Sequence, residues 1–317
     1  MANDLIRVVD IEKGFGGVQV LKKASLTIGP GEIRCLAGEN GCGKSTLIKV
    51  ISGVYAHDGG TVELNGRKYD RLEPIDSIRE GIQVIYQDFS LFPNLTVAEN
   101  LAINHQVERR KNIVSWRDMR ETVKKCLAQI DVDIPLNKTV EQLTVADKQL
   151  VAISRALLND AKVIIMDEPT TALTQKEVDA LFVIIRRLKE RDISTLFVSH
   201  KMREMLEVSE KITIMRNGQV VADGPIRDFD EASITRHMTG RDLEGFEMEV
   251  IAAVVLGGAS LTGGRGTVLG TILGVVILVL IKSSLILVGI PSDWQKVAVG
   301  LVLIIATVIT AIRSRRD

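Results

Sequence analysis

The 317-residue chain has few cysteines, few aromatic residues and no net charge. Its three cysteines, Cys35, Cys42 and Cys126, are too scattered for a disulfide scaffold or a zinc ribbon. Lys plus Arg and Asp plus Glu each number 40, which excludes the basic footprint of a whole-chain nucleic-acid binder. The first ten residues lack the basic start and apolar run of a secretory signal peptide. A reducing, cytoplasmic setting is therefore expected for the N-terminal part.

Charged residues are frequent up to residue 245 and sparse from 246 to 317, where apolar residues dominate. The first part has the composition of a soluble domain, and the second has that of a membrane segment. This shift predicts a soluble domain at 1–242, a junction at 243–249 and a distinct C-terminal part at 250–317.

A glycine-rich loop lies between a short apolar run and a helical pattern. The run covers 33–37, and apolar residues recur at helical spacing from Leu47 to Val54. This strand, loop and helix context indicates a P-loop, which binds nucleotide phosphates. The residues expected to bind nucleotide are Gly38, Glu39, Asn40, Gly41, Cys42, Gly43, Lys44, Ser45 and Thr46.

The chemistry of phosphate binding accounts for these residue types. Glycines let the backbone turn tightly and bring its N–H groups onto phosphate oxygens, and the helix adds its positive N-terminal end. We expect Lys44 to reach the β- and γ-phosphates of ATP, and the hydroxyl of Ser45 to ligate Mg²⁺.

Two adjacent acids end another apolar run. The run covers 163–166 and is typical of a buried parallel strand, and Asp167 and Glu168 follow it. Acids in this position are costly unless they meet a metal or a ligand. Asp167 fits the Mg²⁺ shell, and Glu168 fits the base that polarises an attacking water.

Gln87 and His200 each follow a further apolar strand pattern. With the P-loop and the acidic pair in register, the chain resembles the ATP-binding cassette (ABC) family of transporter ATPases over about 4–242. Three stretches, 15–18, 91–100 and 167–174, resemble more narrowly the first cassette of monosaccharide importers of the ribose, arabinose and galactose type.

The resemblance implies an α/β fold, a P-loop NTPase with an antiparallel β subdomain and a helical subdomain at about 88–160. The amphipathic stretch Trp116–Ile130 would belong to that helical subdomain. The resemblance further implies that Phe15 stacks on adenine, that Gln87 senses Mg²⁺ and the water, and that His200 contacts the γ-phosphate.

One motif departs from the family pattern. The signature Leu-Ser-Gly-Gly-Gln is replaced by Leu-Thr-Val-Ala-Asp, so its variant positions are Thr144, Val145, Ala146 and Asp147. In the family, the signature of one cassette closes the nucleotide site of another, so the resemblance implies a second ABC cassette as partner. Asp147 would place a negative charge near that partner's triphosphate, and a homodimer and a heterodimer both remain open.

Two long apolar runs follow, at 268–290 and 294–312. A helix needs about 20 mainly apolar residues to cross a membrane, so both runs predict transmembrane helices. The basic cluster at 313–316 indicates a cytoplasmic end. The alternative is a packed helical pair in a soluble domain.

The stretches 251–258 and 263–267 resemble the C-terminal end of the permease of the same sugar importers. The resemblance implies that the chain binds and hydrolyses ATP to drive monosaccharide import. Its partners would be a sugar permease and, indirectly, a periplasmic sugar-binding protein, with no nucleic acid. The expected location is the bacterial inner membrane, with the ATPase domain on the cytoplasmic side. The alternatives are a membrane-tethered nucleotide-binding remnant without transport, and a soluble non-transport ABC ATPase.

Overall fold

The computed structural model describes residues 4–102, 121, 123, 130, 134–240, 246–259, 267–287, 297–298, 300–302 and 304. The chain divides into two units, Met1–Gly240 and Arg241–Asp317. Most of the helix expected over Trp116–Ile130, and most of the second apolar run at 294–312, lie outside the described residues.

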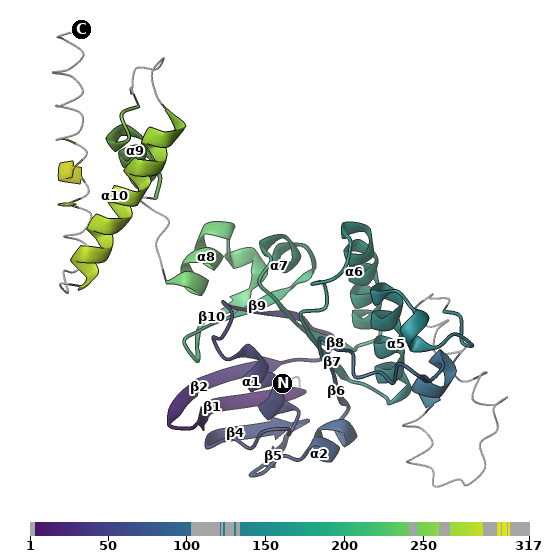
Figure 1. The fold of residues 1–317 in the computed structure, drawn as a ribbon. Coiled ribbons are helices and arrows are strands. Elements are labelled where there is room, and N and C mark those ends of the chain that lie inside the picture. Colours follow the sequence, from purple (N-terminus) through teal and green to yellow (C-terminus); the bar gives the residue numbers. More distant parts are fainter. Residues whose placement is uncertain are drawn as a thin grey trace, which may run out of the picture. The chain divides into compact units, whose positions relative to one another are not determined.

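A six-stranded sheet forms the centre of the first unit (Figure 1). Its strand order is β10-β9-β3-β8-β7-β6, and all strands except β10 run parallel to their neighbours. The inner strands are apolar on both faces, as expected for a parallel sheet covered on both sides. The strands are β3 (Ile33–Ala37), β6 (Ile82–Ile85), β7 (Val163–Asp167), β8 (Ser194–Ser199), β9 (Lys211–Arg216) and β10 (Gln219–Pro225).

A second sheet of four antiparallel strands has the order β2-β1-β4-β5. Its strands are β1 (Ile6–Phe15), β2 (Val18–Ile28), β4 (Gly59–Leu64) and β5 (Arg67–Tyr69). The first two strands form a hairpin, and Gly16 and Gly17, both with positive φ, make its turn. The α/β fold with an antiparallel β subdomain is thereby confirmed.

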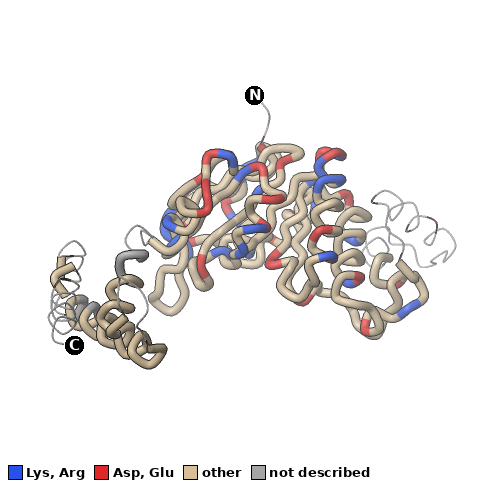
Figure 2. Tube along the Cα trace, turned by 90° about the horizontal axis from the view of Figure 1, so that it is seen from above, with Lys and Arg blue, Asp and Glu red and all other residues tan. Residues whose placement is uncertain are grey.

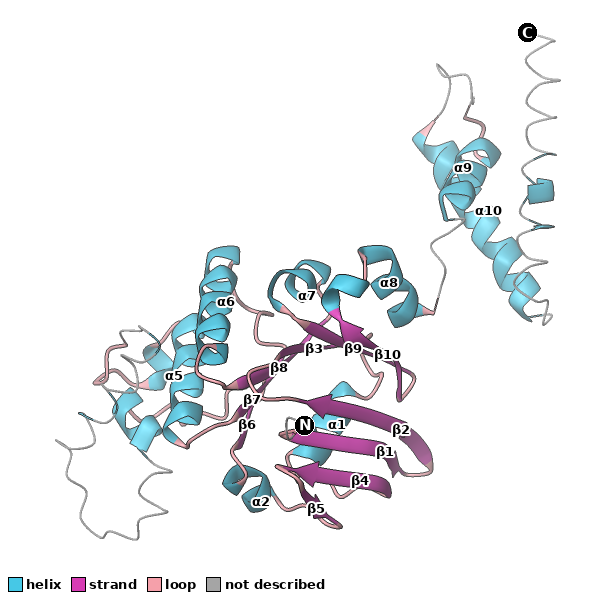
Figure 3. Cartoon of the chain, turned by 180° about the vertical axis from the view of Figure 1, so that it is seen from behind, coloured by secondary structure: helices cyan, strands magenta, loops and turns pink. Residues whose placement is uncertain are grey.

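Helices α5 to α8 cover one face of the six-stranded sheet, and α1 together with the antiparallel sheet covers the other (Figure 3). Ile33, Cys35 and Ala37 of β3 pack in one core with residues from α5 to α8, whereas Leu36 packs in the other core with α1 and the antiparallel sheet. The helices of this unit are α1 (Lys44–Ile51), α2 (Pro74–Arg79), α5 (Val145–Leu158), α6 (Gln175–Lys189), α7 (Met202–Val208) and α8 (Glu231–Thr239), with 3₁₀ turns at Val140–Gln142 and Ile226–Asp228.

The second unit contains α9 (Phe246–Leu256) and α10 (Val268–Leu287), which pack together through small residues. A Cβ atom built on Gly274 would lie 2.0 Å from the carbonyl oxygen of Ala253, so the two backbones touch there. The described residues of this unit carry almost no charge (Figure 2). Among the described residues, one helix is long and apolar enough to cross a membrane, over Val268–Leu285 with a mean hydropathy of 2.3.

Candidate functional site

Four neighbouring parallel strands end at the edge of the sheet where the predicted site residues lie. The P-loop follows β3, His200 follows β8, Asp167 ends β7, and Gln87 lies two residues beyond β6. In the strand register, Ala37 pairs with Ser199. Because parallel strands carry their carboxyl ends to one edge, four separate segments of sequence meet there.

Lys44 begins α1, and its side chain turns back into the P-loop. Its Nζ atom donates hydrogen bonds to the carbonyl oxygens of Gly38, at 2.8 Å, and Glu39, at 2.9 Å. The side chain is 6% exposed. The loop backbone therefore holds the ammonium group of Lys44 at the place where the sequence predicts phosphate binding.

The loop requires glycine at its first position for two reasons. Gly38 has a φ of +152°, and a Cβ atom built there would lie 2.4 Å from the carbonyl oxygen of Met215 and 2.6 Å from Cys42 Sγ. The backbone of the adjacent strand β9, which contains Met215, thus packs directly against the loop at Gly38. Cys42 is buried against it, as a small filling side chain.

Asp167, at the end of β7, and Ser45, on the first turn of α1, line the same pocket. Burial raises the pKa of Asp167, and the hydroxyl of Ser45 opposes that rise. A hydroxyl oxygen and a carboxylate oxygen are ligands that suit Mg²⁺. Two of the residues expected to ligate Mg²⁺ therefore line the same pocket.

Glu168 is held in a strained backbone conformation, with a φ of +50°. Its Oε1 atom lies 3.3 Å from Nδ1 of His200, and its Oε2 atom lies 3.3 Å from the hydroxyl of Thr171. Non-glycine residues adopt such a conformation only where the surroundings maintain it, and they cluster at functional sites. The structure thus brings the expected base and the expected γ-phosphate contact together.

Gln87 precedes a turn that an arginine of α5 holds in place. Phe89 and Ser90 both have positive φ, at +60° and +48°. Arg155 donates from Nη2 to the carbonyl oxygen of Phe89, at 3.1 Å, and from Nη1 to that of Ser90, at 2.7 Å. The helix that begins at the signature segment therefore supports the loop that carries Gln87.

A polar pocket of about 460 Å³ brings most of these groups together, whereas the expected site residues Gly38, Glu39, Cys42 and His200 do not line it. The pocket is lined by the P-loop, the acidic pair and Gln87. Every lining residue except Val20 is among the site residues expected from the sequence. The lining residues are Val20, Asn40, Gly41, Gly43, Lys44, Ser45, Thr46, Gln87, Asp167 and Glu168.

Phe15 does not line this pocket. It lies at the end of β1, 42% exposed, with its ring 5.2 Å from that of Tyr55 in an edge-to-face arrangement. The ammonium of Lys13 lies 5.4 Å from the centre of the Phe15 ring. An exposed aromatic ring close to the glycine turn of the β1–β2 hairpin is available for stacking.

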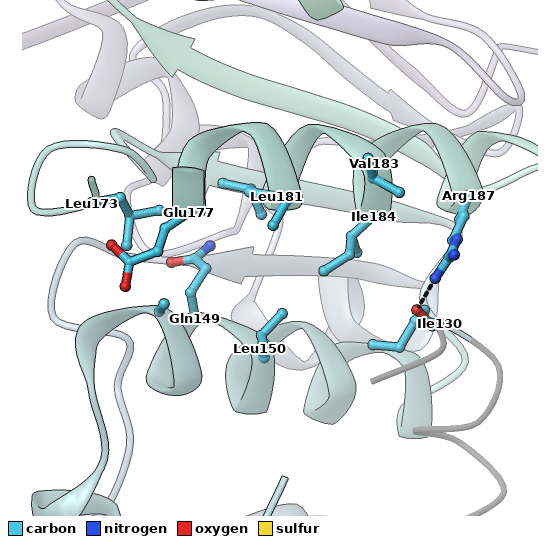
Figure 4. A pocket seen from close by; sticks show the side chains of 11 residues that line it. Ile130, Gln149, Leu150, Leu173, Glu177, Leu181, Val183, Ile184 and Arg187 are labelled. Atoms are coloured by element: carbon cyan, nitrogen blue, oxygen red, sulfur yellow. Dashed lines mark hydrogen bonds between the residues drawn. The ribbon is translucent and has the colours of Figure 1, made fainter. Parts of the chain in front are cut away.

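The signature residues Thr144, Val145, Ala146 and Asp147 do not line the polar pocket of this chain. They lie at the start of α5, where Thr144 caps the helix. Ala146 instead lines a second pocket of about 370 Å³ between α5 and α6 (Figure 4). Because that pocket is mainly apolar and contains none of the phosphate-binding groups, the polar pocket is the candidate site.

Sequence reasoning missed three residues behind the site, Thr170, Lys201 and Glu204. The Nζ atom of Lys201 lies 3.1 Å from the carbonyl oxygen of Thr170 and 3.1 Å from Oε1 of Glu204. The sequence could have indicated the Lys201–Glu204 pair, because opposite charges three residues apart on the first turn of a helix lie close together.

Comparisons with known proteins agree with this geometry. Residues 21–171 match the family "ABC transporter", and residues 234–307 match the family "branched-chain amino acid transport system / permease component". The chain is 40% identical to the D-allose import ATP-binding protein AlsA of Escherichia coli over 247 residues, which are 77% of this chain and 48% of that protein. It is 39% identical to the ribose import ATP-binding protein RbsA 2 of Streptomyces avermitilis over 240 residues, which are 76% of this chain and 48% of that protein.

Solved structures give the same result for the fold. The ADP conformation of an ATP-binding cassette of an ABC transporter is 27% identical, with a TM-score of 0.65, covering 77% of this chain and 98% of that chain. A dimeric cassette in a post-hydrolysis state with ADP and Pi is 25% identical, with a TM-score of 0.61, covering 71% of this chain and all of that one.

The chain spans about half the length of the relatives it matches. Its two family matches cover different segments: residues 21–171 lie in the first unit, whereas residues 234–307 begin near the end of the first unit and continue into the second. The chain therefore contains a segment that matches the ABC transporter family, followed toward its C-terminal side by a segment that matches a permease component.

Proposed function

We propose that the chain is the ATP-binding and ATP-hydrolysing subunit of an ABC importer for a monosaccharide. The observation that carries this proposal is the polar pocket in which Lys44, Ser45, Asp167, Glu168 and Gln87 meet. The relatives named as D-allose and ribose import ATP-binding proteins support the substrate class.

The proposed roles follow from the position of each side chain. The N–H groups of the P-loop and the ammonium of Lys44 bind the phosphates of ATP. Glu168 accepts a proton from the attacking water, and His200, beside it, contacts the γ-phosphate. In-line attack of water on phosphorus then breaks the bond to ADP, so catalysis rests mainly on positioning and charge. Phe15 provides the stacking surface for adenine.

The residues beside the P-loop fit Mg²⁺. Ser45, Asp167 and Gln87 line the same pocket, and their side chains carry a hydroxyl, a carboxylate and an amide oxygen. These three oxygen donors suit a hard cation. When bound, Mg²⁺ neutralises charge on the phosphate oxygens.

The remaining partners are proposed from the relatives and the second unit. The signature segment at the start of α5 would close the site of a second cassette, and the similarity of this chain to a cassette solved as a dimer supports such pairing. The α9–α10 pair would lie with a sugar permease in the bacterial inner membrane, and the first unit would face the cytoplasm. A periplasmic binding protein would deliver the sugar to that permease.

Asp147 motivates a second candidate, a membrane-tethered nucleotide-binding protein without transport. A carboxylate in the signature would repel the triphosphate of a partner cassette. In this case the chain binds ATP through its own pocket but completes no second site.

Steady-state ATPase activity of the full chain in lipid nanodiscs tests the proposal. We expect turnover above that of Glu168→Gln, which removes the base yet retains ATP binding, whereas Glu190→Gln on the exposed end of α6 serves as the matched control. Turnover of Glu168→Gln equal to that of the unchanged chain would remove Glu168 from its role. ATP binding without turnover in the unchanged chain would favour the tethered form.

A further inference from the structure

His200 lies between two residues that bond to the same buried carboxylate. Glu204 is 5% exposed. The hydroxyl of Ser199 donates to its Oε2 atom at 2.6 Å, and Nζ of Lys201 lies 3.1 Å from its Oε1 atom. Both oxygens of Glu204 are therefore occupied, one by each neighbour of His200. A carboxylate so deeply buried requires such partners.

Lys201 also reaches the loop that follows Glu168. Its Nζ atom donates to the carbonyl oxygen of Thr170, at 3.1 Å, and lies 3.3 Å from the hydroxyl oxygen of that residue. Thr170 is itself 3% exposed. An ammonium group has three donors, and three oxygens surround this one: two of Thr170 and one of Glu204.

Two loops are thus joined at two points. At the first, Glu168 and His200 face one another across 3.3 Å. At the second, Lys201 bonds to Thr170. Lys201 is the residue after His200, and Thr170 lies two residues after Glu168. The positive φ of Glu168 needs such external support, because the conformation is unfavourable on its own.

We propose that Lys201, anchored by Glu204 and bonded to Thr170, is a positioning residue that holds His200 against Glu168. This inference rests on the ATPase function proposed above. Lys201 does not line the polar pocket, so it acts through His200 and the loop at 168–171 rather than on the nucleotide. An error of about 1 Å in the placement of reacting groups can lower a rate by as much as about a hundredfold.

The first experiment measures ATP turnover by the full chain with Lys201→Met. We expect kcat to fall about tenfold while KM for MgATP changes less than about twofold. Lys201→Arg, which keeps the charge, should recover part of the loss. The matched control is Lys189→Met, at the C-terminal end of α6. Lys189 also pairs with a glutamate, Glu210, but both side chains are about two-fifths exposed and neither lines the polar pocket.

A double-variant cycle separates positioning from a general loss of folding. In a His200→Ala background, Lys201→Met should cause a clearly smaller fall in kcat, because the part of its effect that passes through His200 is already lost. An equal fall in both backgrounds, or an unchanged kcat of Lys201→Met, would overturn the inference.

Amide hydrogen exchange tests the same inference without turnover. The N–H groups of Thr171 and Leu173 bond within the loop after Glu168, to Glu168 and Thr170 respectively. In nucleotide-free protein, Lys201→Met should speed their exchange several-fold, whereas Lys189→Met should not. Unchanged exchange would contradict the bridge. Since this measurement needs no ATPase activity, an inactive chain would count against the proposed function alone.

Discussion

The backbone N–H of Asp147 donates a 3.1 Å hydrogen bond to the side-chain oxygen of Thr144. Thr144 is the N-cap of α5, and Asp147 is the acidic residue of its first turn. A capping hydroxyl and a carboxylate near the positive end of a helix both stabilise it. The segment that departs from the family signature is therefore a well-capped helix start in this chain.

Removing the cap should destabilise the first unit. We expect Thr144→Ala to lower the free energy of unfolding by about 1 kcal/mol, because one N–H group at the start of α5 loses its partner. Thr144→Ser keeps the hydroxyl and should lie close to the unchanged chain. Denaturant unfolding of the full chain in detergent measures both, and equal stability of the alanine and serine variants would contradict the role of the cap.

Removing the charge of Asp147 should strengthen ATP-dependent pairing of two copies. Two unit charges about 4 Å apart repel by roughly 4 kcal/mol at an effective dielectric constant of about 20, before screening by salt. We expect Asp147→Gln to shift the full chain toward dimers in ATP, in a Glu168→Gln background that prevents hydrolysis. Sedimentation in detergent measures the shift. No change, or a shift that also occurs without ATP, would mean that Asp147 does not face a nucleotide.

The P-loop should tolerate alanine differently at two of its glycines. Gly38 has a positive φ and no room for a Cβ atom, whereas Gly41 has a φ of +80° and open space around it. Gly41→Ala should therefore be destabilised mainly by backbone strain, on the order of 1 kcal/mol. Gly38→Ala should lower the free energy of unfolding distinctly more than Gly41→Ala does, because β9 must also move away from the new Cβ atom. Thermal unfolding compares the two, and equal melting temperatures would contradict the contact with Met215.

Asp167 should make the nucleotide-free protein less stable at neutral pH than an amide would. Burial raises its pKa above the ordinary value of 3.8, so the folded state holds this proton more tightly than the unfolded chain does. Its favourable contribution is complete below pH 3.8 and is lost as the pH rises through the raised pKa. Asp167→Asn should thus raise the melting temperature at pH 7.

The gain should shrink as the pH falls toward 4. Thermal unfolding in EDTA measures it, with Asp228→Asn, at an exposed position, as the control. A gain that stays constant with pH would show that it does not come from ionisation of Asp167.

The contact between α9 and α10 should not tolerate a larger side chain at Gly274. Any Cβ atom there would lie 2.0 Å from the carbonyl oxygen of Ala253, so Gly274→Val must separate the two helices. We expect a lower melting temperature of the second unit in detergent, while Ile272→Val, at a 55% exposed position, leaves it unchanged. A stable Gly274→Val variant would mean that the helices do not meet at this glycine.

Nine of the ten residues that line the polar pocket are among those expected from the sequence to bind nucleotide or Mg²⁺ or to act in catalysis, because the patterns that mark them are local. The P-loop, the acidic pair at Asp167 and the polar residues after two strands each carry a recognisable pattern, and the parallel sheet brings them to one edge. The strands themselves begin and end within a few residues of the apolar runs. The transmembrane prediction at 268–290 coincides with α10, whereas the one at 294–312 lies mostly outside the described residues.

The supporting contacts could not be predicted, because they join side chains distant in the sequence. Lys201 meets Thr170, and Arg155 meets the carbonyl oxygens of Phe89 and Ser90, across separations of about 30 and 65 residues. Nothing in the composition marks an arginine as the partner of a distant carbonyl oxygen. The short α9 was also not predicted, and it begins at Phe246, inside the segment expected to be a junction.

The position of Lys44 has a consequence for how nucleotide enters. Its ammonium bonds to two oxygens of the loop, so if Lys44 binds phosphate as proposed, an arriving phosphate would compete with the carbonyl groups of Gly38 and Glu39. Binding is then an exchange of partners on one ammonium group, and the number of its hydrogen bonds need not change. What changes is the charge of the acceptor, from a neutral carbonyl to an anionic phosphate. Selectivity for polyphosphate over neutral ligands therefore arises before any contact with the base or the sugar of the nucleotide.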